Sequence, residues 1–142
     1  MDTSNERVDM CKKAVEIQKD KPISPCLGDF VYGDDFSEAM IITGLDEHYT
    51  DGTWKVQMDD DHYYADTRDL IFLFQQDQLQ KMLVPTHIVT IPVMIAKFYR
   101  WFADECFCKQ PHLFTMEEFW LAFVMKELYN KVWNGKDWEI TT

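Results

Sequence analysis

The cysteines and the histidine near residue 110 form the pattern closest to a metal site. Cys106 and Cys108 are separated by one residue, and His112 follows. Structural zinc sites usually place two or more residues between the first two cysteines and add a second ligand pair. Neither feature is present. The sequence therefore predicts a helix end with one buried and one exposed cysteine, and no metal or other cofactor.

A second candidate is the acidic run Asp59, Asp60 and Asp61, which is followed by His62. An EF-hand calcium loop alternates its acids with other residues and ends in a glutamate, which this run does not do. Neighbouring strand residues also point to opposite faces, so these carboxylates converge only if the turn is irregular. The run predicts a solvated hairpin tip. A small hydrolase using Asp59, Asp61, His62 and Asp66 stays open as a second alternative.

Motifs for covalent catalysis or phosphate binding are missing from the sequence. The serines lie outside any Gly-x-Ser-x-Gly elbow, and the five glycines are scattered singly. The four histidines show no patterned relation to a serine or cysteine. We therefore expect that the protein is not an enzyme.

The net charge of −11 is concentrated in one segment. Residues 28–79 contain thirteen carboxylates and only two bases, Lys55 and Arg68, whereas the flanking segments are balanced. A general nucleic-acid binder needs a basic surface, so the charge argues against direct nucleic-acid binding. An acidic segment instead steers basic partners toward itself. It is also suited to an acidic phage-type inhibitor that mimics nucleic acid, which we keep as the first alternative.

The acidic segment has the period of a sheet. Trp54, Val56 and Met58 alternate with Lys55 and Gln57, and four further short apolar runs are separated by polar turns. Five short strands within residues 28–75 predict a small closed barrel.

This segment resembles the SH3-like barrels, including the Tudor type. The resemblance rests on Gly28-Asp-Phe-Val-Tyr32, a strand that ends at Gly44, Trp54-Lys-Val-Gln-Met-Asp-Asp60 and Asp69-Leu-Ile71. It covers about a third of the chain and implies a fold but no particular activity, since this fold carries many functions.

The Tudor resemblance implies an aromatic cage for a methylated lysine or an arginine. Such a cage places two or three rings beside a carboxylate and holds the cation by cation–π attraction. Tyr63 and Tyr64 must face opposite sides of a strand, so at most one of them joins a cage. The candidate rings in the segment are Tyr32, Tyr49, Trp54, Tyr63 and Tyr64.

Helices are expected on both sides of the predicted barrel. A capping-box spacing at Thr3–Glu6 predicts a helix within residues 1–21, together with a modest apolar stripe at Val8, Cys11, Val15 and Gln18. Residues 86–134 carry two further stripes, a second capping box at Thr115–Glu118 and a left-handed C-cap at Asn134-Gly135. They predict a two-helix hairpin. Twelve of the residues from 80 to 142 are aromatic, more than two helices can bury between themselves.

The sequence thus predicts an α+β protein that forms a single compact unit over residues 1–142. The expected function is a non-catalytic protein-interaction module, as a structural or accessory component of a larger assembly such as a phage particle. Its partner would be a protein that is basic or held by aromatic anchors, and a homo-oligomer is possible. The expected partner-binding residues are Tyr32, Tyr49, Trp54, Asp59, Asp60, Asp61, Tyr64, Trp133 and Trp138.

No leader or membrane-crossing run is found in the sequence, and the four cysteines are too few for a disulfide scaffold. We therefore expect reduced thiols and a location in the cytoplasm, or in the virion if the protein is encoded by a phage.

Overall fold

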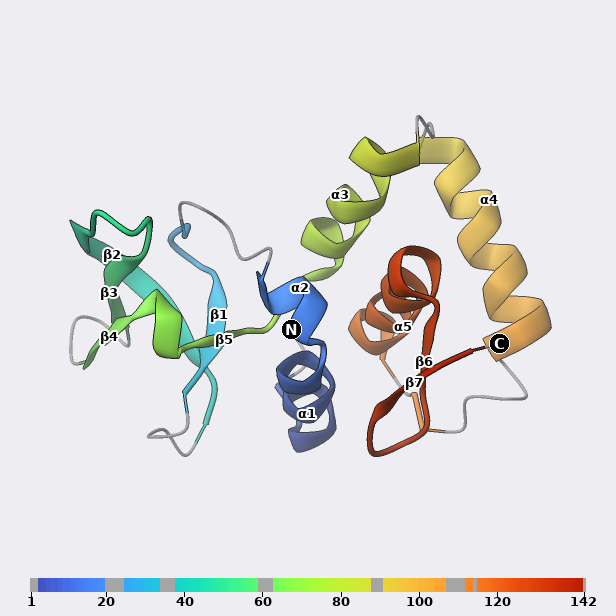
Figure 1. Cartoon of the computed structure of the whole chain (residues 1–142), viewed down its shortest axis with the longest axis horizontal. Helices are drawn as coiled ribbons and strands as arrows, with labels where there is room; N and C mark the ends of the chain where they lie inside the picture. Colours follow the sequence, from blue (N-terminus) through green and yellow to red (C-terminus); the bar gives the residue numbers. More distant parts are fainter. Residues whose placement is uncertain are drawn as a thin grey trace. The chain divides into compact units, whose positions relative to one another are not determined.

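The computed structural model describes residues 3–19, 25–33, 38–58, 63–87, 91–106, 112–113 and 115–141 (Figure 1). The chain divides into two compact units: an N-terminal unit, Thr3–Leu73, and a C-terminal unit that starts at Phe74. Helices and a sheet are both present, which confirms the α+β class. The prediction of a single compact unit stays a prediction.

The N-terminal unit begins with two short helices. Helix α1 spans Asn5–Lys13, and its cap is Ser4, whose hydroxyl accepts a hydrogen bond from the Arg7 amide at 3.2 Å. The chain leaves helical geometry at Ala14 (φ −80°, ψ 63°) and continues as α2, Val15–Lys19. The predicted N-terminal helix is present with a break at Ala14, but its cap is Ser4 instead of Thr3, and Val15 of the expected apolar stripe is 52% exposed.

Five antiparallel strands follow within residues 28–75, as the sequence predicts, but the second strand continues through Gly44 instead of ending there. They are β1 (Phe30–Tyr32), β2 (Met40–His48), β3 (Trp54–Met58), β4 (Tyr63–Asp66) and β5 (Ile71–Phe72), with the 3₁₀ turn η1 (Thr67–Asp69) before β5. The strand order is β4-β3-β2-β1-β5. Residues 59–62, the expected hairpin tip, lie outside the described residues.

The sheet is open, so the predicted closed barrel is wrong. Closure would require β5 to pair with β4, but the free side of β5 is already occupied. The Gln18 side chain accepts from the Phe72 amide at 3.0 Å and donates to the Phe72 carbonyl at 2.9 Å. Its amide group takes the place that a neighbouring strand would fill.

Within its described residues, the C-terminal unit has three α-helices and a β-hairpin, whereas the sequence predicts two helices. Its elements are α3 (Gln76–His87), α4 (Ile91–Trp101), the π-helical turn η2 (Phe102–Cys106), α5 (Met116–Tyr129), β6 (Lys131–Trp133) and β7 (Trp138–Ile140). The capping box of Thr115 and Glu118 is confirmed. Helix α5 ends earlier than predicted, because Asn130 takes the left-handed conformation (φ 54°). Gly135 lies between the two strands of the hairpin.

Aromatic rings join α4 to α5. The Phe98 ring stacks on Trp120 with centroids 3.9 Å apart and meets Phe123 edge to face at 5.4 Å. Phe102 meets Phe119 edge to face at 5.0 Å. Much of the aromatic surface that seemed too large for two helices is thus buried inside the unit.

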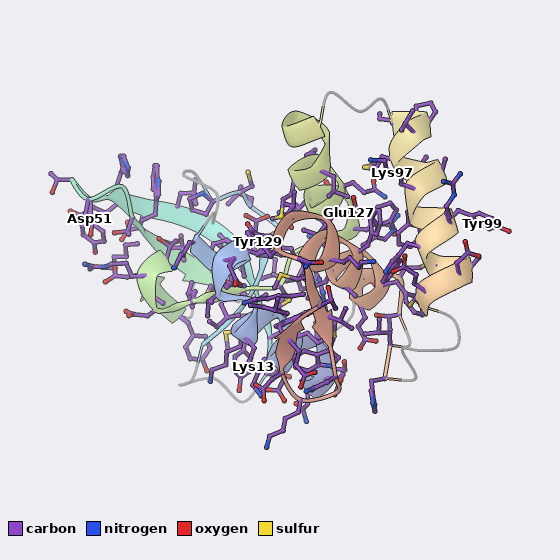
Figure 2. All side chains as sticks on the ribbon, turned by 45° about the vertical axis from the view of Figure 1, so that its right-hand side comes forward. Lys13, Asp51, Lys97, Tyr99, Glu127 and Tyr129 are labelled. Carbon is purple, nitrogen blue, oxygen red and sulfur yellow. The ribbon has the colours of Figure 1, made fainter. Side chains whose placement is uncertain are left out.

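Helix α4 also has a face that none of these rings covers. Tyr99 projects from it away from α5 and is 71% exposed, and Ile91 and Ile95 on the same side are more than half exposed (Figure 2). No helix in the described part of the chain is long and apolar enough to cross a membrane.

Candidate functional site

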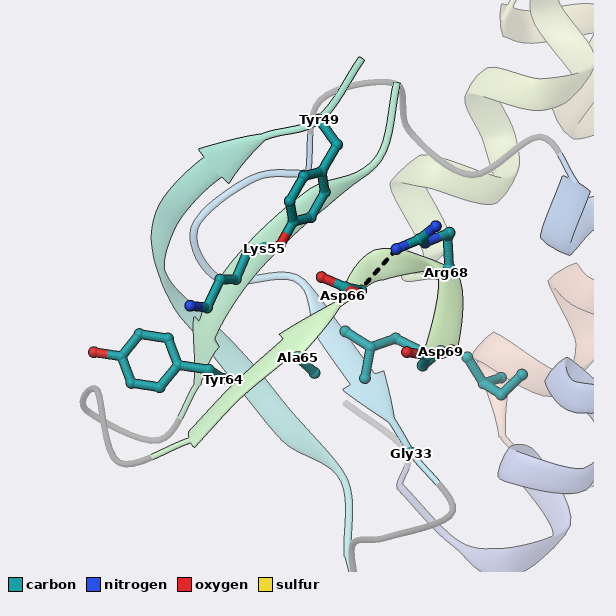
Figure 3. A pocket seen from close by; sticks show the side chains of 10 residues that line it. Gly33, Tyr49, Lys55, Tyr64, Ala65, Asp66, Arg68 and Asp69 are labelled. Carbon is teal, nitrogen blue, oxygen red and sulfur yellow. Dashed lines mark hydrogen bonds and ion pairs between the residues drawn. The ribbon is translucent and has the colours of Figure 1, made fainter. Parts of the chain in front are cut away.

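The N-terminal unit contains a hollow of about 860 Å³ on the side where the sheet fails to close (Figure 3). It lies between the edge strand β4 and the segment from η1 to β5, and Gly33 after β1 lies at its border. The lining residues are Gly33, Tyr49, Lys55, residues 64–66 and residues 68–71. The hollow is mostly polar, and some of its lining residues, Lys55 and residues 64–66, lie on paired strands whose register fixes their positions.

The pairing of β3 with β4 decides which side chains reach the hollow. Lys55 lies opposite Asp66, and Gln57 lies opposite Tyr64, so these four side chains share one face of the sheet. Gly44 on β2 leaves room for Gln57, because a Cβ there would lie 2.5 Å from the Gln57 Oε1 atom. Tyr63 points to the opposite face, as the sequence predicts, and does not line the hollow.

Two cations lie over the two tyrosine rings. Lys55 Nζ is 5.1 Å from the centroid of the Tyr64 ring, and the Arg68 guanidinium is 5.8 Å from that of Tyr49. These distances are within the range of cation–π attraction. Lys55 and Arg68 are also the only two bases of residues 28–79. Both rings therefore already act as cation-binding surfaces.

Carboxylates pair with the same two cations. Arg68 donates to Asp66 at 3.1 Å and to Asp51 at 3.2 Å, and Lys55 lies 3.6 Å from Asp46. All these groups are partly exposed, so each ion pair adds little to stability. Asp69 also lines the hollow and is exposed. The carboxylates outnumber the cations, which makes the surroundings of the hollow negative.

The pKa of the Tyr49 hydroxyl reflects both its burial and the negative charge around it. Partial burial raises its pKa above the ordinary value of 10, and a hydrogen bond to Asp66 and the charges of Asp66 and Glu47 raise it further. Arg68 acts in the opposite direction. The pKa of Asp51 is lowered, first by hydrogen bonds from Thr53 and then by Arg68. Asp51 therefore stays ionised at neutral pH.

We expect the titration of Tyr49 to show the combined effect of its burial and of the negative charge beside it. The difference between the ultraviolet pH titrations of the wild-type protein and Tyr49→Phe should reveal one phenol that ionises above pH 10. Asp66→Asn removes the anionic partner and should shift that titration back toward 10. A Tyr49 phenol that ionises at or below its ordinary value would contradict a negative hollow.

Only part of the predicted site is brought together. Tyr49 and Tyr64 line the hollow, whereas Tyr32 is held in β1, where it pairs with Ile71. Trp54 stacks on His48 with centroids 4.6 Å apart and does not line the hollow. The predicted acids Asp59, Asp60 and Asp61, and His62 of the hydrolase alternative, lie outside the described residues.

The two tryptophans expected to anchor a partner belong to the C-terminal unit. Trp133 is buried, and its ring lies 5.1 Å from that of Trp138 across the β6–β7 hairpin. The Trp133 ring is therefore used for packing within its own unit. Trp138 is half-buried.

Lys55 and Arg68 are the site residues that sequence reasoning missed. The sequence does single them out, because they are the only bases in an acidic segment. By itself, however, this pattern indicates only the charge of the segment. Asp66 was considered only for the hydrolase alternative. The structure places it between Tyr49 and Arg68 instead.

Other reactive groups in the described residues do not form a site. No group of three histidine, cysteine or acidic side chains able to hold a metal ion occurs among them. Burial raises the pKa of the Cys106 thiol to about 11, so this thiol is a weak nucleophile at neutral pH. Cys108, the other half of the Cys-x-Cys pair, lies outside the described residues.

Comparison of this chain with models of protein families, with curated proteins and with solved structures finds no match.

Proposed function

We propose that this protein is a non-catalytic protein-interaction module whose N-terminal unit binds a basic segment of a protein partner in the hollow. The observation that carries the proposal is the pair of tyrosine rings, Tyr49 and Tyr64, each already covered by a cation of the chain itself. A lysine or arginine of a partner would compete for the same ring faces. The resemblance of residues 28–75 to SH3-like domains belongs to this proposal as a likeness of fold.

The charge around the hollow supports a basic rather than an acidic ligand. Both cations of the acidic segment are already paired with aspartates, and the net charge of the chain is −11. An incoming anion would meet this negative field, whereas a cation would be attracted to it from a distance. The affinity for a basic ligand should therefore fall as the salt concentration rises.

The charges and ion pairs of the carboxylates beside the hollow favour binding over acid–base catalysis. An acid that donates a proton near neutral pH needs a raised pKa, usually through burial. Asp51 shows the opposite, a lowered pKa, and Asp66 is held by Arg68 and Tyr49. Asp51 is thus held in its charged form, and both aspartates are ion-paired with Arg68.

The test uses a fluorescent peptide, threonine-valine-arginine-valine-threonine, and measures its affinity for the full chain by anisotropy. Tyr64→Leu removes one aromatic face and should weaken binding about 2–5-fold, the value of one exposed cation–π contact. Tyr63→Leu is the matched control, because Tyr63 is similarly exposed but points to the other face of the sheet. Leucine keeps an apolar side chain on that face, so the affinity should stay unchanged.

Two further arms separate this site from a general effect of charge. Lys55→Met removes the cation that covers Tyr64 and should strengthen peptide binding. Lys81→Met makes the same change of net charge in an exposed ion pair on α3 and should have a much smaller effect, because it leaves Lys55 in place over the Tyr64 ring. Equal losses for Tyr63→Leu and Tyr64→Leu, or equal affinity for a glutamate version of the peptide, would disprove the proposal.

A further inference from the structure

Strand β4 is an edge of the sheet, and the hydrogen bonds of β3 show which of its backbone groups point outward. The Tyr49 amide donates to the Thr53 carbonyl at 2.9 Å, and the Trp54 amide donates to the Thr67 hydroxyl at 3.1 Å. Backbone groups alternate in direction along a strand. The backbone of Thr53, Lys55 and Gln57 therefore faces β2, and that of Trp54, Val56 and Met58 faces β4.

The same alternation applies to β4. Val56 lies opposite Ala65 and Met58 lies opposite Tyr63, so Ala65 and Tyr63 bond to β3. The N–H and C=O of Tyr64 then point away from β3, toward the open side of the sheet. Within the described residues, no strand pairs with this side of β4.

The opposite edge of the sheet is closed by a side chain. Gln18 bonds both backbone groups of Phe72 that face away from β1, at 3.0 and 2.9 Å, and it is itself buried. An unpaired edge is a site where another chain can add a strand, and proteins usually cover or charge such edges. Here β5 is covered, whereas β4 borders the hollow with Tyr64 and Asp66.

We propose that an extended segment of a basic protein partner adds to β4 as an antiparallel strand, with one residue paired to the N–H and C=O of Tyr64. This inference rests on the proposed function and specifies how the partner binds. A guest residue opposite Tyr64 places its side chain on the same face as Tyr64 and Asp66. A lysine or arginine at that position therefore reaches the hollow.

The register also defines the neighbours of the guest cation. The residues on either side of it lie on the face of Tyr63 and Ala65, which continues the apolar side of β3 formed by Val56 and Met58. The preferred ligand thus has an apolar–basic–apolar sequence in extended form. Main-chain bonds supply affinity in this mode of recognition, and alternate side chains supply specificity.

Charge favours such a partner over a second copy of this chain. Pairing β4 with its own copy would bring together two segments that each hold thirteen carboxylates and two bases. The repulsion between the two negative segments opposes self-pairing, whereas the same negative charge attracts a basic strand. A second copy is therefore an outcome that the experiment must exclude.

The experiment measures amide hydrogen exchange in the ¹⁵N-labelled full chain with and without the threonine-valine-arginine-valine-threonine peptide. The Tyr64 amide should exchange fast in the free protein and at least about 10-fold more slowly when the peptide is bound. The Ala65 amide, already bonded to β3, should change little. Protection of Tyr64 without peptide at high protein concentration would show self-pairing and overturn the choice of partner.

Methylated peptides separate strand addition from binding of the side chain alone. A methyl group on the backbone nitrogen of the peptide arginine blocks the bond to the Tyr64 carbonyl and should weaken binding about 10-fold. The same methyl group on the next valine, whose N–H points away from β4, should have little effect. Strand addition is wrong if the two methylated peptides bind with equal affinity and the Tyr64 amide gains no protection from exchange. The proposed function still stands in that case, provided that the parent peptide binds and that its affinity depends on the Tyr64 ring. If the parent peptide does not bind, both fail.

Discussion

Trp120→Ala is expected to destabilise the C-terminal unit by about 3–5 kcal/mol. The ring is 3% exposed, stacks on Phe98 at 3.9 Å and meets Phe123 at 5.9 Å, so its removal leaves a cavity between α4 and α5. Unfolding of the full chain in urea, followed by the amide signals of each unit, measures the loss. The signals of α4 and α5 should disappear at much lower urea concentration than in the wild-type protein.

Tyr99→Ala is the matched control for this change. Tyr99 is the neighbour of Phe98 on α4 and is 71% exposed, so its removal should cost less than about 0.5 kcal/mol. Trp120→Phe should cost less than alanine, because it keeps an aromatic ring and removes a buried indole N–H that has no hydrogen-bond partner among the described residues. An unchanged stability of Trp120→Ala would show that this ring is not part of the core.

The second large effect is expected for Gln18→Leu, which should destabilise the N-terminal unit by about 2–4 kcal/mol. Leucine fills a similar volume but leaves the N–H and C=O of Phe72 without the bonds that Gln18 supplies. The bond to the Cys11 carbonyl at 3.2 Å is lost as well. Urea unfolding observed at the amides of β1 and β5 measures the change, and the Phe72 amide should lose its protection from exchange first.

Gln18→Glu and Lys19→Leu complete this test. The glutamate retains an acceptor for the Phe72 amide but no donor for the carbonyl, so we expect it to destabilise the unit too. Lys19 is the exposed neighbour, and its replacement should have little effect. A Gln18→Leu protein as stable as the wild type would show that this amide does not hold the edge of β5.

These two residues also show what the sequence can and cannot predict. The apolar stripes that contain Trp120 and the capping box at Thr115 are local patterns, and the helix that they predict is present as α5. Gln18 was placed on the stripe of the first helix, and it is indeed buried. Its bonds to Phe72 join residues 54 positions apart, which no local period can reveal, and the open sheet was missed for this reason.

Weak local signals explain the other elements that the sequence did not predict. Helix α3 has three glutamines, and among its described side chains, residues 76–83, the buried apolar ones are Leu79 and Leu83, so its stripe is faint. The hairpin after α5 has three residues in each strand. Its position follows from the left-handed turn at Asn130, whereas the sequence suggested that Asn134-Gly135 ends the helix.

The site was partly visible in the sequence. Alternation correctly separates Tyr63 from Tyr64, because strand geometry fixes this locally. That Tyr49 lies beside Asp66 and Arg68 depends on how β2, β3 and η1 are arranged. Of the rings in the expected aromatic cage, Tyr49 and Tyr64 line the hollow, whereas Tyr32, Trp54 and Tyr63 do not.

The most direct test of the central claim is a map of amide chemical-shift changes when the arginine peptide is added to the ¹⁵N-labelled full chain. We predict that the changes centre on Tyr49, Lys55 and residues 64–69, and that they diminish when salt is raised. Changes centred instead on the exposed face of α4, at Ile91, Ile95 and Tyr99, and insensitive to salt, would contradict the account and make that helix the contact surface.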